Sequence, residues 1–279
     1  MAIPSTRPVT SCPHRSATPL RPPLKWAGGK RWQLPHVLGY WEREKHRRLV
    51  EPFCGGLAVA LGLMPERALL NDINPHLVNF YTWLQRGLTI RLRLQNKSAV
   101  YYSNRHEFNR LLQEGTRESA EAAGLFYYLN RTGYNGLCRF NRRGGYNVPF
   151  GRYAGINYKN GDDFLAYRPV FDCWQFTNLY FSDVPLQPDD FVYADPPYDV
   201  QFRQYSKDGF SWDEQVKTAE WLSHHRGPVV LSNQATARIN ELYNDLGYTL
   251  RFLRGPRRIS CNGDRTPAPE VLAIRNLEG

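Results

Sequence analysis

Short apolar runs separated by turn residues mark the N-terminal part of the chain. Residues 48–51 lead into a glycine turn at 52–56 (PFCGG), and residues 57–64 suit the start of a buried helix. A second apolar run at 68–70 is followed by Asn74, which can cap a new helix because a proline stands at its first position. This alternation of strands and helices predicts a parallel sheet with helices on its faces.

The alternation is interrupted in the middle of the chain and then resumes. Residues 76–130 read as helices, whereas residues 131–160 hold many Gly, Asn, Tyr and Arg residues and read as loops or a hairpin. Apolar runs at 191–194, 228–231 and 271–274 then predict buried strands. The simplest architecture is one α/β domain with a mostly helical insertion between its second and third recognisable strands.

Two further signals complete this organisation. Ser211 and Glu214 stand at the spacing of a capping box, which predicts a helix after the strand at 191–194. Residues 1–23 are rich in Pro, Ser, Thr and Arg and show no periodicity, so they read as a flexible tail.

Length and charge narrow the classes of protein that fit. The chain has 279 residues, 42% of them hydrophobic, which suffices for one large domain with a buried core. Its formal net charge of +10 points to a polyanionic partner, nucleic acid above all. No apolar stretch approaches the ~20 residues that span a bilayer, and the N-terminus lacks the apolar core of a signal peptide. Membrane insertion and secretion are therefore disfavoured, and the lack of a C-x-x-C pair makes a zinc site unexpected.

The glycine turn and the acid that follows it suit a nucleotide-like ligand. Gly55 has no Cβ, so a ligand can approach the backbone closely there. Asp72 lies 17 residues further on, at the end of the next strand, where a carboxylate can accept hydrogen bonds from both hydroxyls of a ribose. The turn has neither a G-x-G-x-x-G pattern nor a basic residue for a pyrophosphate, which favours adenosine without phosphates over NAD. A structural turn with a helix-capping aspartate is the alternative.

A second motif, residues 195–198 (DPPY), directly follows the strand at 191–194. Open α/β sheets bind ligands at the carboxyl ends of their parallel strands. The two prolines fix the backbone and remove two N–H donors, which leaves an acceptor-rich surface that suits an amine. Tyr198 adds a flat face on which a planar base can stack. The alternative is a rigid turn that only terminates the strand.

Residues 122–161 form a basic and aromatic segment within the insertion. The segment contains six basic residues, nine aromatic residues and no acidic residue. Arginine can contact phosphates or read guanine, asparagine can read adenine, and tyrosine can stack on bases. The segment therefore predicts contact with nucleic acid, and a solvated basic face over an aromatic core is the alternative.

A glycine-rich loop at 24–30 (LKWAGGK) carries one aromatic residue and two lysines. It lacks the Ser or Thr and the spacing of a phosphate-binding P-loop. Taken alone, these residues indicate a glycine turn that is either exposed on the surface or part of a site.

Together these strings resemble the Dam-type N6-adenine DNA methyltransferases of the D12 class, which carry a target-recognition region between a cofactor half and a catalytic half. The resemblance extends from about residue 23 to about residue 273. It is carried by the strings at 25–30, 50–56, 71–74, 129–152 and 195–198. The family usually has glycine at the position of Leu57 and often an aromatic residue at the position of Thr132.

The resemblance implies a Rossmann-like class I methyltransferase sheet with an inserted, mostly helical target-recognition domain. Residues 24–75 and 165–279 would form the catalytic domain, and residues 76–164 would recognise DNA. S-adenosylmethionine is the implied cofactor, and double-stranded DNA is the implied partner. The family also implies a cytoplasmic, nucleoid-associated monomer encoded by a bacterium or a phage, with a restriction endonuclease as a potential partner in the same system.

The resemblance also implies roles for individual residues, carried over position by position. The catalytic residues would be Asp195, Pro196, Pro197 and Tyr198. The cofactor would contact Trp26, Lys30, Phe53, Gly55, Asp72, Ile73 and Asp195. The DNA would contact Lys25, Tyr134, Asn135, Leu137, Arg139, Pro149 and Arg152. No metal ligands are expected.

The expected chemistry is the activation of an aromatic amine. A methyl sulfonium is already a strong electrophile, so the reaction requires neither a metal nor a covalent intermediate. Acceptors at Asp195 and at the Pro196 carbonyl would stabilise the positive charge that develops on the amine, after the adenine has been flipped out of the duplex. The expected function is site-specific adenine methylation, with GATC as the first candidate site. A catalytically silent DNA-binding regulator and an RNA methyltransferase are the alternatives.

Overall fold

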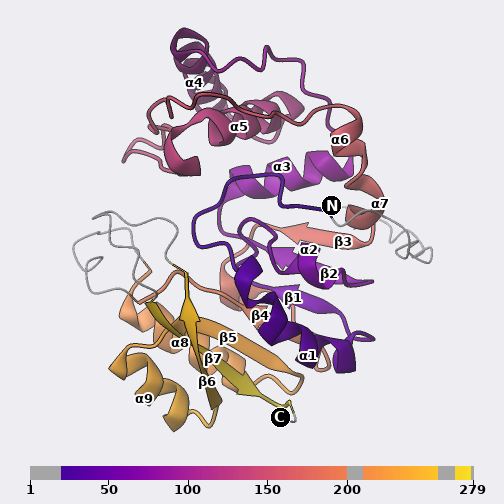
Figure 1. Ribbon diagram of the computed structural model, residues 1–279, viewed down its shortest axis with the longest axis vertical. Coiled ribbons are helices and arrows are strands. Elements are labelled where there is room, and N and C mark those ends of the chain that lie inside the picture. The colour runs from indigo at the N-terminus through magenta and orange to yellow at the C-terminus, as the bar shows by residue number, and fades with distance from the viewer. Residues whose placement is uncertain (1–19, 200–209, 257–267, 278–279) are drawn as a thin grey trace.

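A seven-stranded sheet forms the centre of the computed structural model, which describes residues 20–199, 210–256 and 268–277 (Figure 1). The strand order is β3-β2-β1-β4-β5-β7-β6. The first five strands of this order pair in parallel, whereas β7 runs antiparallel to both β5 and β6. The strands are β1 (Leu49–Glu51), β2 (Ala68–Asn71), β3 (Trp174–Thr177), β4 (Phe191–Ala194), β5 (Val229–Gln234), β6 (Thr249–Gly255) and β7 (Ala268–Arg275).

Helices cover the sheet, and two of them form a separate lobe. In Figure 1, α4 and α5 stand above α3, which contacts β3 as well as α5. The α-helices are α1 (Leu34–Glu44), α2 (Ala60–Leu63), α3 (Pro75–Gln85), α4 (Ser98–Gln113), α5 (Ala120–Thr132), α6 (Asp162–Leu165), α7 (Arg168–Phe171), α8 (Trp212–Ser223) and α9 (Ala237–Asp245). The short 3₁₀ helices are η1 (Arg31–Gln33), η2 (Tyr134–Gly136) and η3 (Phe181–Asp183). Among the described residues, no helix combines the length and apolar character needed to cross a membrane.

Neighbouring residues of the central strands belong to two different cores. In β4, Phe191 and Tyr193 join one cluster of buried side chains, whereas Val192 and Ala194 join another. The first cluster extends into α1, α3 and α5, and the second extends into α8 and α9. Successive side chains of a strand point to opposite faces, so β4 is buried on both faces, which explains its uninterrupted apolar sequence. The mostly parallel sheet, covered on both faces, confirms the predicted α/β fold.

The predicted strands are present, and the structure adds two that the sequence pattern does not predict. The run at 191–194 is β4 itself, and the runs at 68–70, 228–231 and 271–274 lie largely within β2, β5 and β7. The two additional strands, β3 and β6, are the edges of the sheet. Both are partly exposed, so neither needs the continuous apolar run that marks a central strand.

Both predicted helix caps are confirmed. The side chain of Asn74 accepts hydrogen bonds from the N–H groups of His76 and Leu77, at 3.0 and 3.4 Å. Ser211 accepts a hydrogen bond from the N–H of Glu214 at 3.2 Å, and the Glu214 carboxylate accepts one from the N–H of Ser211 at 2.8 Å. Local sequence therefore fixes where α3 and α8 begin.

The segment between α5 and α6 forms an open hairpin that is held against α4. Isolated bridges pair Gly133 with Phe150 and Phe140 with Tyr146. The side chain of Asn109, in α4, accepts a hydrogen bond from the N–H of Tyr146 at 2.7 Å and donates one to its carbonyl at 3.1 Å. The predicted combination of helices followed by loops or a hairpin is therefore confirmed.

The last residues of the predicted N-terminal tail contact the folded chain, whereas residues 1–19 lie outside the described residues. The Tyr167 hydroxyl donates a hydrogen bond to the carbonyl of Arg21 at 2.6 Å. Pro23 is buried. Within the predicted tail, Arg21 and Pro23 therefore belong to the folded part of the chain.

A buried asparagine at the end of β2 holds the loops that follow β1 and β3. Asn71 is 1% exposed, and its amide group donates to the carbonyls of Pro52 and Leu179, at 2.9 and 3.0 Å. Its carbonyl oxygen accepts from the N–H of Leu179 and from the hydroxyl of Thr177, both at 2.9 Å. The full hydrogen-bonding capacity of the side chain is used, so β2 positions the loops on both sides of it.

We predict that Asn71→Ala lowers the free energy of unfolding by roughly 2–4 kcal/mol, because its partners in both loops would lose their hydrogen bonds in a buried environment. Urea-induced unfolding followed by circular dichroism measures this loss. Asn244→Ala, at an exposed position of α9, is the matched control and should change stability by less than about 0.5 kcal/mol. Equal stability of the two variants would contradict the linking role of Asn71.

Candidate active site

The order of the central strands brings the two predicted motifs to one edge of the sheet. Strands β2, β1 and β4 are neighbours and run in parallel. The glycine turn follows β1, Asp72 follows β2, and Asp195 follows β4. Since the carboxyl ends of parallel strands lie on the same side of a sheet, residues that are far apart in the sequence meet there.

Asp72 is held by backbone N–H groups of the glycine turn and of the start of α3. Its Oδ2 accepts a hydrogen bond from the N–H of Gly55 at 3.0 Å, and its Oδ1 accepts one from the N–H of Asn74 at 2.9 Å. Burial raises the pKa of Asp72, and these two N–H donors partly offset the rise. Each oxygen keeps a lone pair for a further donor. The neighbouring Ile73 side chain is 66% exposed.

The glycine turn also packs against the N-terminal loop. A Cβ on Gly55 or Gly56 would lie within 3 Å of the Trp26 side chain, so glycine permits this contact. Phe53 packs against Phe181, with ring centroids 5.5 Å apart. Trp26 and Phe53 are both half-buried, and the structure therefore brings the predicted cofactor residues of two separate loops to the same turn.

Leu57 occupies a backbone conformation that glycine would adopt more readily. Its φ is 59°, in the left-handed region, and its side chain is 0% exposed. Leucine in this region costs about 1–2 kcal/mol relative to an ordinary conformation. Glycine would adopt this conformation without that cost, whereas this chain accommodates leucine by burying it in the core.

Lys30 and Asp195 form an ion pair at the centre of the site. Nζ of Lys30 lies 2.9 Å from Oδ2 of Asp195 and also donates to the carbonyl of Gly28 at 2.6 Å. Lys30 is 7% exposed, so the 24–30 loop is not simply a surface turn. The other carboxyl oxygen, Oδ1 of Asp195, is buried and has no hydrogen-bond partner. Burial raises the pKa of Asp195, and the charge and hydrogen bond of Lys30, followed by the hydroxyl groups of Tyr198 and Ser232, act to lower it.

The rest of the 195–198 string is fixed by side chains from other elements. Pro196 is buried, whereas Pro197 is exposed and its carbonyl accepts a hydrogen bond from Gln215 at 2.7 Å. Nζ of Lys30 lies 4.4 Å from the centroid of the Tyr198 ring. The Tyr198 hydroxyl lies 2.7 Å from a hydroxyl of β5, that of Ser232. Residues 195–198 are therefore held in place by contacts with Lys30, Gln215 and Ser232.

The predicted DNA-contacting residues of the hairpin are mostly exposed. Tyr134 is 50% exposed, and Leu137 is half-buried. The guanidinium of Arg139 is oriented by Asn147, to which it donates at 2.8 and 3.3 Å. The exposed members of the set also include Asn135, Arg139, Pro149 and Arg152. The hairpin thus presents one oriented cation and several polar or flat groups to solvent.

Lys25 is docked beside this hairpin. Asn130 accepts a hydrogen bond from the N–H of Lys25 at 2.9 Å and donates one to its carbonyl at 2.7 Å. Nζ of Lys25 donates to the carbonyl of Arg131 at 3.0 Å and lies 3.6 Å from the centroid of the Tyr153 ring. Burial, and then the charge of Arg131, lower the pKa of Lys25 to about 8. Gly136, with φ of 63°, leaves no room for a Cβ against Lys25.

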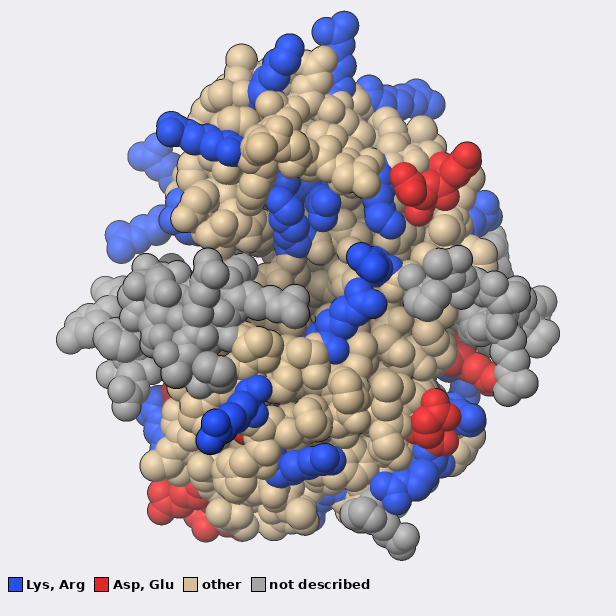
Figure 2. Space-filling model, viewed as in Figure 1, with Lys and Arg blue, Asp and Glu red and all other residues tan. Residues whose placement is uncertain are grey.

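A hollow separates the lobe of α4 and α5 from the sheet. Figure 2 shows Lys and Arg side chains on the lobe and around this hollow, whereas the acidic side chains of the same face lie away from it. Opposite signs of charge attract over a distance of about one Debye length, ~8 Å at physiological salt. The face therefore favours an anionic partner.

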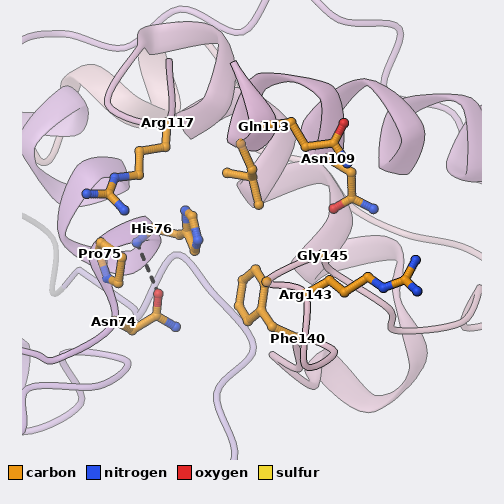
Figure 3. A pocket seen from close by; sticks show the side chains of 11 residues that line it. Asn74, Pro75, His76, Asn109, Gln113, Arg117, Phe140, Arg143 and Gly145 are labelled. Carbon is orange, nitrogen blue, oxygen red and sulfur yellow. Dashed lines mark hydrogen bonds between the residues drawn. The ribbon is translucent and has the colours of Figure 1, made fainter. Parts of the chain in front are cut away.

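A separate pocket lies between the start of α3, α4 and the hairpin (Figure 3). The side chains of His76 and Arg117 point towards it, and His76 stacks on Phe140 with ring centroids 4.9 Å apart. Burial, and then Arg117, lower the pKa of His76 to about 4, so its ring is neutral at pH 7. None of the residues that line this pocket is a predicted site residue.

The structure adds residues that sequence reasoning did not include. Glu51 ends β1, is 2% exposed, and its Oε1 has no hydrogen-bond partner; burial raises its pKa well above the ordinary value. In the sequence, the position of Glu51 directly before the glycine turn is the feature that could have identified it. Ser232 and Glu270 hydrogen-bond with the Tyr198 hydroxyl, and Gln33 donates to both of them. Of these, Ser232 alone carries a local signal, because it begins a polar stretch within an apolar strand.

Comparison with known proteins identifies the family. The chain matches the model of the D12 class N6 adenine-specific DNA methyltransferases over residues 26–253. It is 34% identical over 271 residues to the retron Ec67 DNA adenine methylase of Escherichia coli, which covers 90% of both chains. It is 35% identical over 268 residues to a DNA adenine methylase of Vibrio cholerae, which covers 90% of this chain and 94% of the relative.

A third relative is encoded by a phage. The chain is 34% identical over 271 residues to the DNA N-6-adenine-methyltransferase of Escherichia phage P1, a match that covers 90% of this chain and 35% of that protein. The match to the family model and these identities agree with the resemblance carried by the short motifs. The chain belongs to the D12 class of N6 adenine-specific DNA methyltransferases, enzymes that use S-adenosylmethionine to methylate adenine in DNA.

Proposed function

We propose that this chain methylates the N6 amine of an adenine flipped out of duplex DNA, at GATC sites, and that Asp195 is its principal hydrogen-bond acceptor. The observation that carries the proposal is the asymmetry of the Asp195 carboxyl group. Lys30 holds Oδ2 at 2.9 Å, whereas Oδ1 is buried without a partner. An unsatisfied buried acceptor costs free energy, so this oxygen is suited to receive an N–H group of a ligand.

The residues beside Asp195 fit S-adenosylmethionine. Asp72 keeps one free acceptor site on each oxygen for the two ribose hydroxyls. Ile73, next to it, offers an exposed apolar face to a purine ring. When bound, the cofactor supplies a methyl group on a positively charged sulfur. The residues that would hold it are Trp26, Lys30, Phe53, Gly55, Asp72, Ile73 and Asp195.

The chain's own contribution is to make the adenine amine nucleophilic. The nitrogen lone pair is delocalised into the ring, which weakens it as a nucleophile. Hydrogen bonds to Oδ1 of Asp195 and to the Pro196 carbonyl would draw the amine towards a tetrahedral geometry and stabilise positive charge on it. S-adenosylmethionine, when bound, would supply the methyl group, and the Asp195 carboxylate would hold the amine while it loses one N6 proton to solvent.

Lys30 would keep Asp195 in the form that this reaction needs. A carboxylate accepts hydrogen bonds at both oxygens, whereas a protonated carboxyl group has one oxygen that donates. Burial favours the protonated form, and the nearby ammonium group favours the ionised form. The ion pair therefore supports an acceptor within a buried site.

The lobe and its hairpin would recognise the DNA, with residues 76–164 as the target-recognition domain. The duplex would lie along the positively charged hollow of Figure 2, and its phosphates would contribute most of the affinity. GATC as the target rests on the similarity of residues 129–152 to the Dam-type recognition region. The flipped base would stack on Tyr198, which offers ~1–3 kcal/mol and offsets part of the cost of leaving the helix.

We predict that Asp195→Ala lowers the single-turnover rate of methyl transfer by at least about 100-fold, because the amine loses its charged acceptor. Binding to duplex DNA should stay within a few-fold of that of the unsubstituted protein. Transfer of labelled methyl groups to a duplex measures the rate, and a filter-binding assay measures affinity. Asp213→Asn, at an exposed position of α8, serves as the control. An Asp195→Ala protein with normal turnover would refute the role of this carboxylate.

Arg139→Ala should chiefly reduce discrimination between GATC and sites altered at one base pair, by ~1–3 kcal/mol, because an oriented guanidinium can bind a guanine through two hydrogen bonds. Ratios of kcat/KM for the two duplexes give this discrimination. Arg142→Ala, at an exposed position in the same hairpin, should instead weaken all duplexes alike. Equal losses on every sequence for Arg139→Ala would identify it as a phosphate contact.

DNA affinity should fall with rising pH through the deprotonation of Lys25. The pKa of Lys25 is lowered to about 8, so its positive charge is present below that pH and is lost above it. Dissociation constants measured between about pH 7 and about pH 9.5 should therefore rise for the unsubstituted protein, whereas Lys25→Arg should flatten the profile because arginine stays charged. The same slope in both proteins would assign the pH dependence to other groups.

A further inference from the structure

A polar cluster outside the predicted site residues anchors the hydroxyl of Tyr198. This hydroxyl donates to Oε2 of Glu270 at 2.6 Å and lies 2.7 Å from Oγ of Ser232. The amide of Gln33 donates to the same two side chains, in each case at 2.9 Å. We name Gln33, Ser232 and Glu270 the tyrosine anchor.

The tyrosine anchor is buried and draws on three distant parts of the chain. Gln33 and Ser232 are 0% exposed, and Glu270 is 9% exposed. Gln33 ends η1, Ser232 lies in β5, and Glu270 lies in β7. The carbonyl oxygen of Gln33 accepts a further hydrogen bond from the Tyr193 hydroxyl at 2.7 Å. Because buried polar groups are costly unless they are hydrogen-bonded, such a cluster is stable only while its members stay paired.

The carboxyl group of Glu270 is confined where it lies. Gly255, in β6, approaches this carboxyl group so closely that a Cβ would have no room. The Trp32 side chain lies at the same place. Oε1 of Glu270 therefore faces the neighbouring strand, whereas Oε2 accepts from the Tyr198 hydroxyl.

Stacking on a base does not itself require the tyrosine hydroxyl, because a base packs on the face of the ring. The hydroxyl instead determines how the ring is oriented. Nζ of Lys30 lies 4.4 Å from the centroid of that ring and 2.9 Å from Oδ2 of Asp195. The orientation of the ring and the position of the carboxylate are thus linked through one ammonium group.

We infer that Glu270 is a positioning residue for methyl transfer. It holds the Tyr198 hydroxyl, and so fixes the ring on which the flipped adenine stacks and aligns the N6 amine with Asp195. The inference rests on the proposed function, since it assumes that an adenine enters this site. In this role Glu270 acts through Tyr198, whose hydroxyl its Oε2 accepts together with the amide of Gln33.

A double-mutant cycle tests the inference. We expect Glu270→Ala and Tyr198→Phe each to lower the single-turnover rate by about 10- to 100-fold, since a misplacement of about 1 Å has effects of this size. KM for DNA and for S-adenosylmethionine should remain unchanged, because no binding contact is lost. The double variant should be no slower than the slower single variant, because both substitutions break the same contact.

Two further variants separate positioning from a general loss of stability. Glu270→Gln keeps an acceptor for the Tyr198 hydroxyl and should restore most of the rate. Tyr248→Phe also removes a buried tyrosine hydroxyl, one that donates to the carbonyl of Ala219 at 2.8 Å, and should lower the thermal midpoint without lowering the rate.

Three outcomes would overturn the inference. They are a normal rate for Glu270→Ala, rate losses that multiply in the double variant, and a Glu270→Gln protein as slow as Glu270→Ala. In each of these cases the unsubstituted protein still methylates duplex adenine, so the proposed function would stand. If the unsubstituted protein transferred no methyl group to duplex adenine, both proposals would fail.

Discussion

The ion pair between Lys30 and Asp195 joins two parts of the chain that lie far apart in the sequence. Lys30 belongs to the loop before α1, and Asp195 follows β4 in the middle of the sheet. A buried ion pair is stabilising only when its geometry is good and its remaining groups are hydrogen-bonded. Here the lysine is fully engaged, with the Gly28 carbonyl, the carboxylate and the Tyr198 ring, whereas one oxygen of the aspartate is left unpaired. The unpaired oxygen is what makes the pair suitable for a site.

Sheet order explains why so few elements build this site. Because β2, β1 and β4 are adjacent, the ends of three strands bring Asp72, the glycine turn and Asp195 together without long loops. Asn71 then connects the turn to the loop after β3 through hydrogen bonds to both. The lobe of α4 and α5 is held differently, by α3 and by the contact of Lys25 with Asn130. Helix α3 and the loop of Lys25 thus both link this lobe to the sheet.

The sequence predicts those parts of the molecule whose signals are local. Strand β4 is buried on both faces and reads as a continuous apolar run, and the caps at Asn74 and Ser211 depend on neighbours within a few residues. Asp195 and Tyr198 are found because they follow a recognisable strand. Glu270 could not be predicted, since it meets Tyr198, 72 residues away, only through the pairing of β7 with β5. Edge strands were missed for a related reason, because partial exposure leaves them without a distinctive pattern.

The left-handed conformation of Leu57 has a consequence for how the glycine turn keeps its shape. Glycine adopts this conformation at little cost. Leucine can adopt it because burial of its side chain contributes about 1.5–3 kcal/mol, which offsets the conformational cost. The conformation of the glycine turn in this chain therefore depends on the packing of Leu57 in the hydrophobic core. The shape of the turn and the integrity of that interior are consequently coupled, and loosening of the core on heating would be transmitted to the backbone of the proposed cofactor site.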